Sequence, residues 1–183
     1  MGKDSTSDIL YILGLIGCIM VLVNTVIELQ EWTLAASFVA ADLLNRFLMG
    51  GGFVLVGVGF IGIYRDSGSY VPLLVTVMWP LGQVVSILAS SLTSDPNYVY
   101  LGMLLIVFLL MGYSVYLFRE PIGSFATLAS IVFIGWAFGQ LIIRFLDPTG
   151  TDLFNLQIYW SGQGIIFFIA LVYFILAIRS GKS

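Results

Sequence analysis

Residues 9–27 read ILYILGLIGCIMVLVNTVI, a run that carries no charged side chain. A transmembrane helix needs about 20 predominantly apolar residues to cross a hydrocarbon core of about 30 Å. The run is therefore long enough for one crossing, and Glu28 and Glu31 close it. A signal peptide would have a shorter apolar core and a small-residue cleavage site. We therefore expect a retained first transmembrane helix.

The composition of the whole chain agrees with this first stretch. The 183 residues are 60% hydrophobic and only 9% charged, whereas a soluble domain carries about 25% charge. The sequence predicts an integral protein of a cell or plasma membrane. It has no His and one Cys, which removes the usual ligands of zinc, copper and haem, so no metal or other cofactor is expected. The few basic residues are scattered, which argues against a nucleic-acid partner.

Apolar runs bounded by charge, Pro or Gly recur along the whole chain. The expected transmembrane helices cover residues 9–29, 38–64, 71–92, 99–118, 122–146 and 156–178. Strands of a membrane barrel would alternate apolar and polar residues over about 10 positions, and these runs do not. Because the connections are short, we predict an all-α fold: one transmembrane domain over residues 1–183, a six-helix bundle built from helical hairpins.

The basic residues predict the orientation of the bundle. Lys and Arg are in excess in short cytoplasmic loops. With the N-terminus inside, five of the seven basic residues fall on the cytoplasmic side and two on the outer side. The five are Lys3, Arg65, Arg119, Arg179 and Lys182, and the two are Arg46 and Arg144. Both termini are therefore expected in the cytoplasm.

A weak internal repeat of about 55 residues runs through the hairpins. Residues 64–66 (Tyr-Arg-Asp) and 118–120 (Phe-Arg-Glu) stand at corresponding turns, and a Gly-Gln pair follows each turn, at residues 82–83 and 139–140. Residues 102–145, with Pro-Ile-Gly at 121–123 and glycines in both helices, resemble a short repeat of the HdeD family. That resemblance implies a six-helix membrane protein associated with acid resistance.

Polar side chains within the apolar runs are the candidates for function, because ionisable and amide groups are costly in a membrane. On the predicted topology they gather in the outer half of the bilayer, and the inner half is expected to be almost wholly apolar. This candidate outer polar layer consists of Glu28, Asp42, Arg46, Gln83, Gln140, Arg144 and Gln163. Two interpretations stay open: an outward-facing polar vestibule, or interfacial anchors and amide contacts between helices.

Small residues spaced by four predict close contacts between helices. Two such rows stand out, Gly82, Ser86 and Ser90 in one helix and Gly135 and Gly139 in another. The cluster of glycines at 50–52 permits either tight packing or a broken helix lining a cavity. It does not match a phosphate-binding loop, which needs a preceding strand and usually a Lys.

These features disfavour an enzyme, since no His, metal site or pair of aspartates stands near the bilayer centre. We expect a non-enzymatic accessory or structural subunit in a larger membrane complex, with the lipid bilayer and other membrane subunits, or further copies of itself, as partners. The alternative is a small channel or transporter that begins at the outer polar layer. The apolar inner half favours the subunit, because a solute path should cross the whole bilayer.

Overall fold

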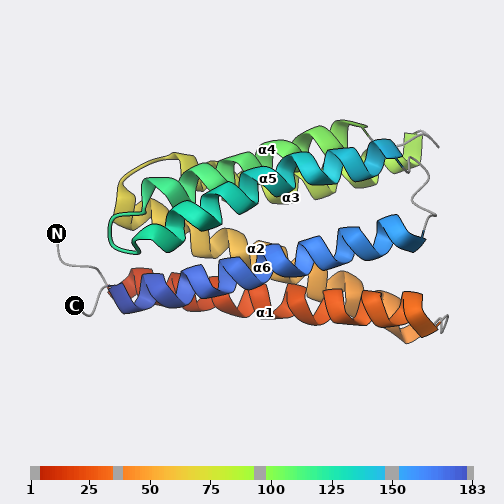
Figure 1. Cartoon of the computed structure of the whole chain (residues 1–183), viewed down its shortest axis with the longest axis horizontal. Coiled ribbons are helices and arrows are strands. Elements are labelled where there is room, and N and C mark those ends of the chain that lie inside the picture. The colour runs from red at the N-terminus through yellow and green to blue at the C-terminus, as the bar shows by residue number, and fades with distance from the viewer. Residues whose placement is uncertain (1–4, 35–38, 93–97, 147–152, 181–183) are drawn as a thin grey trace.

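The computed structural model describes residues 5–34, 39–92, 98–146 and 153–180, and in these ranges the chain is helical with no strand (Figure 1). The helices are α1 (Ser5–Leu34), α2 (Val39–Ser67), α3 (Val71–Leu92), α4 (Tyr98–Leu117), α5 (Ser124–Leu146) and α6 (Leu153–Ser180). The expected runs coincide with them, although α1 and α6 are longer than the apolar runs that predicted them. Four helices, α1, α2, α5 and α6, are long and apolar enough over their described residues to cross a membrane.

The helices run up and down in chain order. Each helix packs against the next one, and α6 returns to α1, so the six form a closed ring. Figure 1 shows that α1 begins and α6 ends at the same end of the bundle, here called the terminal end. In that view α3, α4 and α5 form one group and α1, α2 and α6 the other. Of the contacts between successive helices, that between α5 and α6 is the least extensive.

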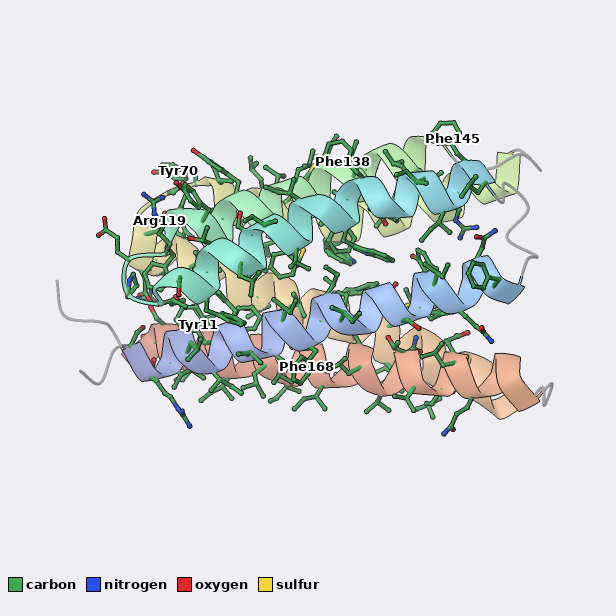
Figure 2. The ribbon with its side chains drawn as sticks, in the orientation of Figure 1. Tyr11, Tyr70, Arg119, Phe138, Phe145 and Phe168 are labelled. Carbon is green, nitrogen blue, oxygen red and sulfur yellow. The ribbon has the colours of Figure 1, made fainter. Side chains whose placement is uncertain are left out.

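The exterior of the bundle is apolar, as expected of a protein surrounded by lipid. Large exposed hydrophobic side chains occur on every helix, and Figure 2 shows Phe138 and Phe145 of α5 directed away from the bundle. A soluble monomer rarely exposes contiguous apolar patches of more than a few hundred Å². The structure therefore supports a membrane protein by its surface as well as by its helix lengths.

Aromatic rings fill the middle of the ring of helices. The Trp79 ring of α3 lies 4.2 Å from Phe53 of α2, 5.6 Å from Phe108 of α4 and 6.2 Å from Phe167 of α6, measured between ring centroids. All four side chains are buried. Cys18 of α1 is also buried. Rings at these separations gain dispersion and quadrupole attraction in addition to burial.

The closest helix contact is between α1 and α2, where backbones meet at glycines. A Cβ at Gly17 would lie 2.5 Å from the Gly52 carbonyl oxygen, and one at Gly14 would lie 2.9 Å from the Gly59 Cα. No larger residue fits without moving a backbone. Helix α2 is continuous through residues 50–52, so the broken-helix alternative is wrong, and at Gly52 the cluster serves tight packing.

Both described turns at the terminal end of the bundle use a glycine in the left-handed region. Gly68 has φ of 69° and Gly123 has φ of 79°. The Gly68 N–H donates to the Tyr64 carbonyl at 2.8 Å, and the Gly123 N–H donates to the Arg119 carbonyl at 2.7 Å. Gly68 directly follows α2 and satisfies one of its last carbonyls, as a left-handed glycine after a helix commonly does. Gly123 instead directly precedes α5, and its acceptor Arg119 belongs to the turn. The two turns therefore share a left-handed glycine but not its place.

Candidate functional site

Two of the predicted glutamines are buried inside the bundle. Gln140 of α5 is 1% exposed and Gln163 of α6 is 3% exposed, and the Nε2 of each has no hydrogen-bond partner in the structure. Asn24 of α1 is fully buried as well; its Nδ2 contacts the Met49 sulfur at 3.8 Å, and its Oδ1 accepts no hydrogen bond. A buried polar group without a partner costs about 1–3 kcal/mol. These amides are therefore poorly satisfied by the chain itself.

Asn24 and Gln163 lie at a common level. At a rise of 1.5 Å per residue, they stand roughly 26–29 Å from the terminal end along α1 and α6. Gln140 lies on α5 one turn beyond Trp136, whose ring packs against Gly162 of α6. A direct contact fixes the register of α1 and α6, because a Cβ at Gly164 would lie 3.3 Å from Cγ2 of Thr25. The aromatic rings begin just below this level, at roughly 21 Å for Phe53. The interior thus changes from amide to aromatic over little more than one helical turn.

The predicted charged residues are placed more shallowly. Glu28 is half-buried on α1, and Arg144 is half-buried on α5. The Arg144 guanidinium lies over the Tyr159 ring of α6, with Cζ 5.7 Å from the centroid, close enough for a cation–π contact. Arg144 thereby connects α5 to α6 beyond Gln140, on the side away from the terminal end.

Five predicted residues have side chains outside the described part of the structure. Asp42 and Arg46 belong to α2, and Gln83, Ser86 and Ser90 belong to α3. Their helices form as expected, but the pairing of Asp42 with Arg46 and the contacts of Gln83 stay predictions. Gly82, which begins that small-residue row, is buried and faces α4, where its Cβ would lie 3.8 Å from the Met103 Cβ.

The second row of small residues differs from the sequence expectation. Gly135 is exposed, and a Cβ there would meet nothing within 4 Å, whereas a Cβ at Gly139 would meet only the Trp136 ring of its own helix. The row therefore brings no other backbone close within this chain. It faces outward because the buried face of α5 runs through Ala126, Ala129, Phe133, Ala137 and Gln140 instead.

An apolar groove of about 310 Å³ occupies the loose seam between α5 and α6. It is lined by Val132, Gly135, Trp136, Gly162, Ile165 and Ile166. The Trp136 ring lies against Gly162, where it leaves no room for a Cβ, and its centroid is 6.0 Å from that of Tyr159. Neither buried glutamine is among the lining residues. Gln163 shares the buried face of α6 with Phe167, and Gln140 belongs to the buried face of α5.

The terminal end, which the predicted topology makes the inner half and expects to be almost wholly apolar, holds a polar cluster. Asp66 of α2 accepts hydrogen bonds from the Ser7 hydroxyl at 2.6 Å and the Tyr11 hydroxyl at 2.8 Å, both from α1. Tyr173 of α6 is buried, and its hydroxyl has no hydrogen-bond partner, although it interacts electrostatically with Asp66. Sequence patterning did not reveal this cluster, because hydropathy treats tyrosine as nearly apolar.

Metal binding has no support in the described residues, among which no three His, Cys, Asp or Glu side chains gather as a metal site would require. Comparison with known proteins adds no relative: no family model, curated protein or solved structure matches this chain. The resemblance to the HdeD family therefore stays a prediction.

Proposed function

We propose that this chain is a non-enzymatic, six-span membrane protein with both termini in the cytoplasm, acting as an accessory or structural subunit of a larger membrane complex. Two features support the topology. The helices alternate in direction with α1 beginning and α6 ending together, and Arg65, Arg119 and Arg179 all stand near the terminal end, as the bias of basic residues towards the cytoplasm requires.

The observation that carries the proposal is a seam on the outward face of α1. Ile9, Ile12, Ile16, Ile19, Val23 and Val26 are spaced alternately by three and four residues, and each is between 41% and 58% exposed. This is the spacing of a heptad seam, in which β-branched side chains insert between those of a partner helix. Lipid tails require only apolar groups. The restriction to Ile and Val favours a packed helix instead, so we assign the seam to a transmembrane helix of a partner subunit.

The filled interior supports a subunit over the alternative, a channel or transporter with an outward-facing vestibule. A solute path should continue through the bundle, but the rings of Phe53, Trp79 and Phe167 lie directly below the level of the buried amides. A path through a single chain would have to displace these rings. A protein that serves by packing needs no such path.

The test is purification from native membranes in mild detergent. We expect the wild-type chain to recover another membrane polypeptide in a fixed ratio. Replacing Ile12→Ala and Ile19→Ala together removes two knobs of the seam and should lower that recovery at least tenfold, a change of about 1.4 kcal/mol in association. The control, Ile131→Ala with Ile142→Ala, truncates isoleucines of α5 that are more exposed than Ile12 and Ile19, and it should leave recovery unchanged.

Two outcomes would contradict the proposal. One is a wild-type chain that purifies alone or only with copies of itself. The other is a partner polypeptide that is recovered equally with the α1 variant, Ile12→Ala with Ile19→Ala, and with the α5 control variant.

A further inference from the structure

The outward face of α4 carries two tyrosines at the terminal end, and an arginine stands in the turn that follows. Tyr113 is 50% exposed and Tyr116 is 38% exposed, and Arg119 is exposed at the same end (Figure 2). The Arg119 Cζ lies 4.0 Å from the centroid of the Tyr116 ring, which is a cation–π contact. A guanidinium stacked on a ring still presents N–H donors to an anion at its edge.

The turn holds Arg119 in this position. Its N–H donates to the Tyr116 carbonyl at 3.2 Å, and its carbonyl accepts from the N–H groups of Ile122 at 3.1 Å and Gly123 at 2.7 Å. Among the described residues, no carboxylate pairs with the Arg119 guanidinium. The positive charge is therefore placed in advance by the backbone and by the ring, and the described part of the chain does not neutralise it.

Apolar surface continues along the same face of α4. Ile106 is 44% exposed and stands two helical turns from Tyr113. At a rise of 1.5 Å per residue, Tyr113 lies about 6 Å and Ile106 about 17 Å from the end of α4. One leaflet contributes half of the hydrocarbon core, about 15 Å. From the terminal end inward, the face thus presents a cation, two phenol hydroxyls and an apolar strip that reaches the depth of one leaflet.

We propose that this face of α4, formed by Ile106, Tyr113, Tyr116 and Arg119, binds one anionic glycerophospholipid in the leaflet at the terminal end. Its phosphate pairs with the Arg119 guanidinium, its ester carbonyl oxygens accept hydrogen bonds from the tyrosine hydroxyls, and an acyl chain lies along Ile106. The order of groups in the lipid, phosphate then ester then chain, is the order that the face presents.

Charge complementarity selects this occupant. Guanidinium groups bind phosphate through paired hydrogen bonds, and tyrosines at the level of the lipid headgroups keep an apolar ring and a polar tip in suitable surroundings. The site rests on the membrane placement proposed above but not on the partner subunit. In the ring of helices two others separate α4 from α1 on either side, and Figure 1 shows the two at opposite edges of the bundle, so a partner on α1 leaves α4 facing lipid.

The experiment is native mass spectrometry of the detergent-solubilised full chain with added phosphatidylglycerol, and with phosphatidylcholine as the probe whose headgroup has no net charge. We expect the wild type to retain one phosphatidylglycerol per chain, and to retain phosphatidylcholine roughly fivefold less. Arg119→Gln should retain the two lipids alike. Arg119→Lys keeps the charge but loses the stacked, paired donors, so it should lower retention of phosphatidylglycerol roughly threefold.

The control is Arg179→Gln, which removes the same charge from an exposed position at the same end of the bundle. Leu176 stands three residues before Arg179, where Tyr116 stands before Arg119, so this variant should retain lipid as the wild type does. The proposal is overturned if the wild type retains both lipids equally, if the two Arg→Gln variants behave alike, or if Arg119→Lys equals the wild type. Because the isolated chain is measured, the absence of a partner subunit does not alter these results.

Discussion

At the scale of one residue, Asp66 has hydrogen-bond partners that the order of polar residues in the sequence does not reveal. Its carboxylate accepts from Ser7 and Tyr11, which are 59 and 55 positions away in sequence. In the sequence Asp66 is one of several charged residues in a turn, and Tyr11 is one of many aromatics. Only the packing of α1 on α2 makes them partners, and this hydrogen-bonded pair then ties the two helices together at the terminal end.

Replacing Tyr11→Phe should therefore lower the free energy of unfolding. The change keeps the ring but removes a hydrogen bond to a carboxylate, which is worth about 1.5–3 kcal/mol. Thermal or denaturant unfolding in detergent micelles would measure it. Tyr70→Phe is the control, because Tyr70 is exposed at the same end of the bundle (Figure 2). Equal stability of the two variants would mean that the Tyr11 hydroxyl contributes nothing.

At the scale of elements, the close backbone contact between α1 and α2 involves neither of the two rows of small residues that the sequence predicts as contact sites. The rows beginning at Gly82 and Gly135 have the expected spacing, yet the closest approach occurs at Gly17 and Gly52. Spacing shows that one face of a helix is small. It does not show whether that face is turned towards a neighbour, because the rotation of each helix is set by the packing of the whole ring.

Gly17→Ala should destabilise the bundle, since the new Cβ would meet the backbone of residues 52 and 56, which cannot move aside as a side chain can. Overpacking of this kind typically costs about 1–3 kcal/mol. Gly102→Ala adds the same methyl group where nothing lies within 4 Å. We expect it to be neutral or slightly stabilising, because alanine favours a helix by about 1 kcal/mol over glycine. Unfolding curves in which Gly17→Ala is the more stable variant would refute the close approach.

At the scale of the whole molecule, the proposed orientation can be tested by labelling cysteines in intact cells. The native Cys18 is fully buried, so added cysteines report alone. With both termini in the cytoplasm, Gln30→Cys should react with a membrane-impermeant maleimide from outside, and Glu120→Cys should react only after permeabilisation. Both positions are exposed in the structure. The opposite pattern would invert the topology, and equal labelling from outside would exclude six spans.

The sequence by itself determined the helical class and the positions of the six helices, because an apolar run of sufficient length has few other stable forms in a membrane. It also pointed to Gln140 and Gln163, since an amide is conspicuous among Leu, Ile and Phe. Only the tertiary structure decided the rest. It brings Asp66 to the hydroxyls of Ser7 and Tyr11, places glycines at the contact between α1 and α2, exposes Gly135 and packs aromatic rings in the centre. Each depends on which face of one helix meets which face of another. That rotation results from the simultaneous packing of all six helices, and no single stretch of sequence contains it.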